Sequence, residues 1–131
     1  MPDVPTHPVP LALSRVALAD RDHTPASGDW RPHPKFPGVA MRQLAGGPDT
    51  GGAYSLHQVR IDPGCAIETH IHPDNDESHL VLSGHGTCAI AGRETAYDPG
   101  VCGVLPKGVE HRVGAGTETL YILATFVPAL A

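Results

Sequence analysis

Three histidines and a glutamate in the middle of the chain have the residue types and the spacing of a metal site. His70 and His72 are separated by one residue, Glu77 follows after four more, and His111 comes from a later segment. Side chains at i and i+2 of a β-strand point to the same face, so His70 and His72 present two imidazoles to one side. Glu77 opens the next segment and can turn back towards them. Neutral imidazoles with a carboxylate suit Zn, Fe, Ni and Cu, so the pattern predicts one divalent ion here.

A further histidine leaves the ligand set open. His79 lies two residues after Glu77 on the same predicted strand, so we expect it to face the same side. It either binds the ion, in place of Glu77 or beside it, or is a buried histidine hydrogen-bonded to a neighbour. His57 shares a face with Val59 and Ile61, which favours a contact to a ligating residue or to substrate. We assign proton transfer to whichever of Glu77, His79 and His57 does not bind the ion, or to a hydroxide bound to the ion.

Short alternating segments between glycine- and proline-rich turns surround these residues. Short strands with frequent turns are typical of an all-β sandwich or barrel. The sequence contains no convincing long amphipathic helix. The expected strands cover residues 39–44, 54–62, 66–72, 77–83, 87–91, 101–105, 110–113 and 119–127.

The chain of 131 residues fits a single folded domain preceded by an arm. Residues 1–35 are proline-rich and show no sustained hydrophobic period, so we expect an extended arm with one short strand around 14–19. Residues 36–131 form the expected barrel. Four histidines outside the candidate site are expected in solvent, at an interface or in a turn: His7, His23, His33 and His85.

Composition narrows the range of partners. The net charge of −5 and the pI near 5.9 disfavour nucleic acid and anionic membranes, which both require a basic face. No apolar stretch reaches the length of a membrane span, and the N-terminal residues lack the regions of a signal peptide, so we expect a cytoplasmic protein. The three cysteines, Cys65, Cys88 and Cys102, do not suggest a disulfide framework, and we expect them to be reduced and buried.

Glycines and a proline around the candidate ligands complete two longer patterns. The first consists of Gly64, His70, His72, Glu77 and Gly84, which are separated by five, one, four and six residues in turn. The second consists of Gly100, Pro106, Gly108 and His111, which are separated by five, one and two residues in turn. Both resemble the two motifs of the cupin superfamily, although the asparagine that commonly ends the second motif is Ala115 here. The resemblance implies an antiparallel jelly-roll β-barrel, commonly a homodimer, with the metal inside.

A cupin site is compatible with several functions, because one fold hosts many. The three classes are a metal-assisted cyclase or isomerase, a dioxygenase, and a non-catalytic protein that binds a small ligand. The complete ligand set argues against the third class. Four imidazoles favour a redox-silent Zn ion acting as a Lewis acid, whereas three histidines with Glu77 resemble cupin dioxygenases.

The short chain, the proline-rich arm and His79 resemble the cupin-type cyclases of aromatic polyketide biosynthesis. This resemblance implies an enzyme that closes a ring in a poly-β-keto intermediate by aldol condensation, with Zn favoured and Fe, Ni, Mn or Cu as alternatives. The ion is expected to bind a substrate carbonyl and stabilise the developing charge. An apolar cavity for this small molecule is expected between the inward faces of Val59, Ile61, Val81 and Ile90.

Overall fold

The computed structural model describes residues 13–131, which form twelve strands and two short helical turns. The strands are β1 (Val16–Ala17), β2 (Asp22–His23), β3 (Arg31–Pro32), β4 (Val39–Ala45), β5 (Ser55–Ile61), β6 (Ala66–His70), β7 (Asp76–Ser83), β8 (Gly86–Ile90), β9 (Arg93–Tyr97), β10 (Cys102–Leu105), β11 (His111–Ala115) and β12 (Leu120–Val127). The helical turns are a 3-10 turn (Ser27–Asp29) and α1 (Gly47–Thr50).

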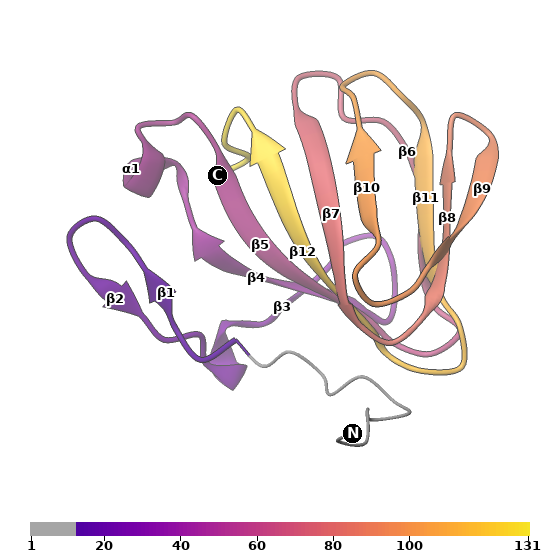
Figure 1. Ribbon diagram of the computed structural model, residues 1–131, viewed down its shortest axis with the longest axis horizontal. Helices are drawn as coiled ribbons and strands as arrows, with labels where there is room; N and C mark the ends of the chain where they lie inside the picture. Colours follow the sequence, from indigo (N-terminus) through magenta and orange to yellow (C-terminus); the bar gives the residue numbers. More distant parts are fainter. Residues whose placement is uncertain (1–12) are drawn as a thin grey trace, which may run out of the picture.

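Two antiparallel sheets make up the barrel. The larger sheet has six strands in the order β10-β7-β12-β5-β4-β3, and the smaller has four in the order β6-β11-β8-β9. In Figure 1 the larger sheet spreads from β10 to β4, and the strands of the smaller sheet close against it on the right. This arrangement confirms the predicted jelly roll with almost no helix.

One strand of the smaller sheet was not predicted from the sequence. β9 (Arg93–Tyr97) pairs with β8 along its whole length. Its residues are mostly polar and exposed, and only Tyr97 is fully buried. Alternation identifies a strand only when several apolar residues share one face, and this strand has too few of them.

The larger sheet begins before the predicted domain boundary at residue 36. In β3, Arg31 pairs with Met41 and Pro32 pairs with Ala40 of β4. The strand expected around residues 14–19 is present as β1, which pairs with β2 in a short hairpin. Residues 1–12, which include much of the predicted arm and His7, lie outside the described residues.

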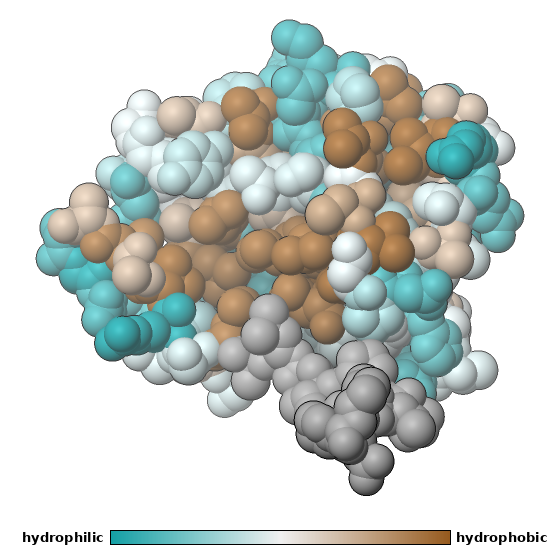
Figure 2. All heavy atoms as spheres, viewed as in Figure 1, coloured by the Kyte–Doolittle hydropathy of each residue, from teal (hydrophilic) through white to brown (hydrophobic). Residues whose placement is uncertain are grey.

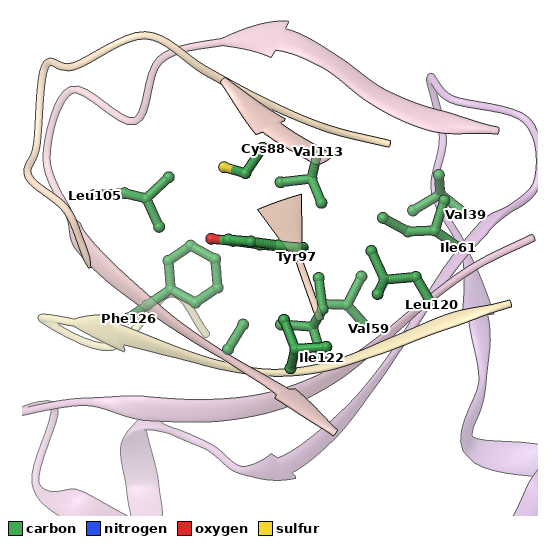
Figure 3. Close-up of a cluster of buried hydrophobic side chains, with 12 residues drawn as sticks. Val39, Val59, Ile61, Cys88, Tyr97, Leu105, Val113, Leu120, Ile122 and Phe126 are labelled. Carbon is green, nitrogen blue, oxygen red and sulfur yellow. The ribbon is translucent and has the colours of Figure 1, made fainter. Parts of the chain in front are cut away.

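Alternating side chains of the strands fill the space between the two sheets. In β12, Leu120, Ile122, Ala124 and Phe126 are buried while the residues between them are more exposed. Each large apolar side chain buried in this way contributes about 1.5–3 kcal/mol. Figure 3 shows Tyr97 in the middle of the cluster that they form with the other strands. The buried members of the cluster are Val39, Val59, Ile61, Val81, Cys88, Tyr97, Leu105, Val113, Leu120, Ile122, Ala124 and Phe126.

The turn that ends β7 requires glycine. Gly84 has a φ of 79°, a left-handed conformation that other residues rarely adopt. A Cβ atom added at Gly84 would lie 2.0 Å from the backbone oxygen of Thr119, which precedes β12. Both constraints explain why the first motif ends with this residue type.

The surface carries apolar as well as polar residues. Figure 2 shows hydrophobic residues in a band across the middle of one face, with hydrophilic residues around it. Cys88 is buried and Cys65 is half-buried, but Cys102 is exposed, so the expected burial of all three cysteines is wrong for Cys102. All three are free thiols. In the part of the chain that the structure describes, no helix has the length and apolar character needed to cross a membrane.

Candidate metal centre

His70 and His111 face each other on neighbouring strands of the smaller sheet. His70 ends β6, His111 begins β11, and the two are direct partners in the antiparallel register. Their ring centroids are 4.2 Å apart. His72 lies just beyond the end of β6, yet its Nε2 is 3.2 Å from the Nε2 of His70. The predicted strand therefore ends early, but its two imidazoles still converge.

Glu77 reaches this cluster from the larger sheet. Its side chain extends from β7 and is buried, and Oε1 lies 3.4 Å from His72 Nε2 and 3.3 Å from His111 Nε2. One donor atom from each of four residues lies within 4.8 Å of the others: His70, His72, Glu77 and His111. The two sheets thus jointly build a three-imidazole, one-carboxylate group that could hold a metal ion.

The hydrogen bonds of His70 and His111 place a proton on the outward nitrogen of each of these two rings. The Nδ1 atoms of His70 and His111 lie 2.7 and 3.2 Å from the carbonyl oxygens of Glu68 and Val109. A carbonyl oxygen only accepts, so each ring carries its proton on Nδ1 and directs a lone pair inward from Nε2.

Two of the inward atoms have no partner at all. His111 Nε2 and Glu77 Oε1 are buried without a hydrogen bond. Buried polar atoms are normally paired, and lone pairs that converge on one point repel one another. A cation between them removes both costs, so the residues present fit a divalent ion.

The turn of the second motif holds the loop that carries the ligands. The N–H of Gly108 donates to the carbonyl of His72 over 2.9 Å, and the N–H of Lys107 donates to the carboxylate of Asp76 over 2.9 Å. Asp76 is the first residue of β7, next to Glu77. The second motif therefore positions two ligands of the first motif as well as its own histidine.

His79 lies behind Glu77 and outside the group of four. Its Nε2 is 2.7 Å from Glu77 Oε2, and its Nδ1 is 2.9 Å from the hydroxyl of Tyr97. The hydroxyl donates to Nδ1 and Nε2–H donates to the carboxylate, so both ring nitrogens are occupied. A Cβ atom on Gly103 would lie 1.9 Å from the Tyr97 hydroxyl, so this glycine makes room for the chain of hydrogen bonds.

The electrostatics of the cluster match metal ligation. Burial lowers the pKa of His70 and His72, so both imidazoles are neutral at pH 7, the form that binds a metal. Burial alone would raise the pKa of Glu77, but its interactions with neighbouring histidines, among them the hydrogen bond with His79, outweigh burial and lower this pKa to about 2. His70 and His72 thus offer neutral imidazoles, and Glu77 offers an ionised carboxylate.

His57 is separated from the cluster by an aromatic ring. Phe126 makes edge contacts with His57 on one side and His72 on the other, at centroid distances of 5.5 and 5.2 Å. The Nε2 of His57 is 2.9 Å from the hydroxyl of Ser55, which also accepts from the N–H of Leu130. Because burial lowers the pKa of His57, this ring is neutral too. Its position argues against direct contact with a ligand of the metal centre.

A cavity adjoins the cluster and offers about 120 Å³ to solvent, room for several waters or part of a small organic ligand. Its polar lining consists of the four cluster residues, His79 and His33. Its apolar lining consists of Met41, Val59, Ile67, Val113, Ile122, Phe126 and Leu130.

The predicted apolar lining is right only for Val59. Ile61 and Val81 are buried in the core and Ile90 packs against it, and none of them borders the cavity. Alternation gives the face of a strand on which a residue lies. It does not give the residue's position along the barrel, and these three lie in or against the core instead of beside the cavity.

His33 borders the same cavity, although the sequence suggested only a solvated or interfacial residue. It follows β3, and its backbone N–H donates to the carbonyl of Val39 over 2.8 Å. No spacing relates it to the ligands, so a motif search could not find it. The one signal is its position between two prolines, Pro32 and Pro34, which restrict the backbone on both sides.

Several solved structures share this fold. KdgF from Halomonas sp. is 22% identical, with a TM-score of 0.68 over 76% of this chain and 86% of that chain. Ectoine synthase from P. lautus is 20% identical, with a TM-score of 0.68 over 79% and 71% of the two chains. The polyketide cyclase RemF from Streptomyces resistomycificus is 22% identical, with a TM-score of 0.65 over 74% and 70%. At such identities the likeness establishes the fold alone.

Sequence comparison gives the family. No curated protein matches the chain. A family described as "Cupin domain" matches residues 57–126, which is more than half of the chain and includes all four residues of the cluster. The chain therefore belongs to the cupin domain family.

Proposed function

We propose that this protein is a metal-dependent enzyme that closes a ring in a neutral poly-β-keto substrate by aldol condensation. The proposal rests above all on two buried donor atoms without partners, His111 Nε2 and Glu77 Oε1. Zn²⁺ suits the donor set, and Fe, Ni, Mn and Cu are alternatives. When bound, the ion polarises a carbonyl oxygen and stabilises the charge that develops on it.

The walls of the cavity favour a substrate without charge. Seven of the lining side chains are apolar, and among residues 13–131 no lysine or arginine borders the cavity. A carboxylate or phosphate group would therefore meet no positively charged side chain in these walls. A neutral chain of carbonyl and methylene groups instead finds apolar contact along its length and a cluster of donors at one end.

Ring closure of such a chain needs neither an oxidant nor a reductant. A methylene carbon between two carbonyls loses a proton, and the resulting enolate carbon forms a bond to a distant carbonyl carbon of the same molecule. The oxygen of that carbonyl takes up the proton to give a hydroxyl group, and loss of this group with a neighbouring hydrogen as water completes the condensation, so atoms and electrons balance. The cavity walls contribute by excluding water and by holding the chain folded, which favours the intramolecular reaction.

Of the three candidate proton acceptors, only Glu77 presents an unoccupied atom to the cavity, and it acts as the base only if it does not bind the ion. It borders the cavity and has a free oxygen, Oε1, whereas both nitrogens of His79 are occupied. His57 does not border the cavity. Because Oε1 is also a potential metal donor, Glu77→Gln separates the two roles. Retained metal with lost turnover supports proton transfer by Glu77, and lost metal supports ligation.

A dioxygenase is the second candidate, because the cluster contains three histidines and a glutamate and does not include His79. This donor set resembles cupin dioxygenases more than a four-imidazole zinc site does. The two candidates differ in their need for O2: the cyclase consumes none, and the dioxygenase incorporates it into product.

Turnover without oxygen tests the proposal. Metal-loaded protein is incubated anaerobically with a synthetic poly-β-ketone, and the cyclised product is measured by mass spectrometry and ultraviolet absorbance. His111→Ala serves as the metal-site variant and His85→Asn, at an exposed turn residue, as the matched control. Ring closure by wild type and the control, but not by His111→Ala, supports the cyclase. In a parallel incubation in air, stoichiometric O2 consumption supports the dioxygenase, and tight binding without turnover in either incubation supports a non-catalytic protein.

A further inference from the structure

His33 enters the cavity wall from an irregular segment of the chain. The preceding strand β3 pairs with β4, and the His33 N–H donates to the Val39 carbonyl. These contacts fix the backbone of the two residues before His33 and of His33 itself. The half-buried side chain borders the cavity that the metal cluster also borders.

The hydrogen bonds of the His33 ring determine which nitrogen carries the proton. Its Nδ1 accepts from the backbone N–H groups of Lys35 at 3.0 Å and Phe36 at 3.2 Å. A ring that accepts at Nδ1 and is neutral must carry its hydrogen on Nε2. Burial and the charge of Lys35 both lower the pKa of His33, which favours the neutral form. The ring therefore has a fixed donor at Nε2.

Aromatic contacts connect this ring to the metal cluster. His33 stacks on Phe36 with centroids 4.7 Å apart and an interplanar angle of 27°. Phe36 in turn lies 6.3 Å from the ring of His70. Phe36 is thus the common aromatic neighbour of His33 and of the metal ligand His70.

The other polar side chains of the cavity wall are occupied. Four of them form the metal cluster, and His79 has a partner at each ring nitrogen. Within the described part of the chain, His33 is the one polar lining residue outside this network, and its hydrogen bonds are both at Nδ1. An apolar cavity that has one further donor in addition to a metal cluster can select the position of one oxygen atom of its ligand.

We propose that His33 donates a hydrogen bond from Nε2 to an oxygen atom of the bound molecule, and so fixes which end of an otherwise apolar ligand faces the metal cluster. The inference rests on the proposed function, because it concerns the substrate class of the same cavity. The ligand class it predicts is a neutral, flat molecule with two carbonyl oxygens at opposite ends.

Two probe molecules of nearly the same shape test this inference by binding alone. The first is a naphthalene with an acetyl group on each ring. In the second, an isopropenyl group replaces one acetyl group, so that C=CH2 stands where C=O was. The affinity of the metal-loaded protein for each probe is measured by calorimetry, and the ratio of the two affinities is the readout. Because the readout is binding, it does not depend on whether the protein cyclises polyketides.

Two substitutions separate the roles of the two ring nitrogens. His33→Asn retains an acceptor near the position of Nδ1, so the backbone contacts to Lys35 and Phe36 can persist, but it removes the donor at Nε2. His33→Gln places an amide N–H near the position of Nε2. His85→Asn is the matched control, because His85 is exposed and does not border the cavity. Thermal unfolding of each variant verifies that it is folded.

We expect wild type and His85→Asn to bind the diacetyl probe about threefold to tenfold more tightly than the isopropenyl probe, the range of one net hydrogen bond. His33→Asn should abolish this preference, and His33→Gln should restore part of it. An unchanged preference in a folded His33→Asn protein, or no preference in wild type, would overturn the inference. A probe preference that depends on His33, together with no turnover of the poly-β-ketone by the metal-loaded protein, would instead count against the proposed function alone.

Discussion

The two sides of the cavity are built in different ways. On one side, His70, Glu77 and His111 belong to paired strands, and the turn at Lys107 and Gly108 holds the loop between them. On the other side, His33 projects from an irregular segment after a two-residue strand. The metal side is therefore fixed by strand pairing, and the His33 side by local hydrogen bonds. This difference suggests that ion affinity and ligand choice can be changed independently.

Removing a metal ligand should have the largest effect on the metal side. His111→Ala leaves a gap beside Glu77 Oε1 and takes away one of three imidazoles. We expect Zn²⁺ affinity, measured by calorimetry on metal-stripped protein, to fall at least about 100-fold, beyond the usual effect of changing a residue that only orients a ligand. The exposed control His85→Asn should bind as wild type does. Equal affinity in His111→Ala and wild type would contradict the assignment.

Acidification should release the ion, because protons compete for the imidazoles. The pKa values of His70 and His72 are below the ordinary 6.5, so the ion should be held at pH 7 and lost only as the pH falls below 6.5 through these lowered values. Below its pKa, each imidazole that must lose a proton to bind the ion lowers the apparent metal affinity roughly tenfold for every pH unit.

The metal-free protein should lose stability over the same pH range. Its unfolded imidazoles bind protons more tightly than the folded ones, so the free energy of unfolding decreases as the pH falls. Calorimetry and urea unfolding across neutral to mildly acidic pH measure both effects. An apparent Zn²⁺ affinity that does not change over this pH range would show that imidazoles are not the main ligands.

His79 should act through Glu77, and two variants distinguish this from direct ligation. His79→Leu removes the donor to Glu77 Oε2 and should weaken Zn²⁺ binding about 10-fold to 100-fold, as loss of a hydrogen bond to a ligand usually does. His79→Gln can still donate to this oxygen and should recover most of the affinity. If His79 itself bound the ion, both variants would lose affinity alike, and Glu77→Gln would change little.

Gly103 should matter for stability because of the space that it leaves for Tyr97. A methyl group there would lie 1.9 Å from the Tyr97 hydroxyl, so Gly103→Ala must displace a buried ring that hydrogen-bonds to His79. We expect a loss of about 1–3 kcal/mol in the free energy of unfolding, measured with urea. Gly28→Ala is the control, since a Cβ atom at Gly28 meets nothing within 4 Å. Equal stability of the two variants would show that the ring relaxes without cost.

The smallest expected effect is on the His33 side. His33→Asn should leave Zn²⁺ affinity within about twofold of wild type, because neither the ring nor its hydrogen bonds belong to the metal cluster. Calorimetric titration of metal-stripped protein provides the measurement. A large loss of Zn²⁺ affinity in this variant would show that the two sides are coupled, and would break the distinction between them.

The sequence predicts the metal side of the cavity but not the His33 side. The spacing of His70, His72, Glu77 and His111 indicated a metal site, and the structure brings these four together because strand alternation and motif turns determine where they point. His33 could not be predicted, because an irregular segment has no period from which a direction can be read. The role of His79 also depended on structure: strand period correctly turned it inward, but only the positions of Tyr97 and Glu77 show that both its nitrogens are occupied.

X-ray absorption spectroscopy of the Zn-loaded protein tests the ligand set most directly. Together with metal analysis, it should give one ion per chain bound by three imidazole nitrogens and one carboxylate oxygen, from His70, His72, His111 and Glu77. The folded His79→Gln variant should give the same spectrum. A fourth imidazole that disappears in His79→Gln, or a protein that binds no divalent ion under any condition, would contradict this assignment.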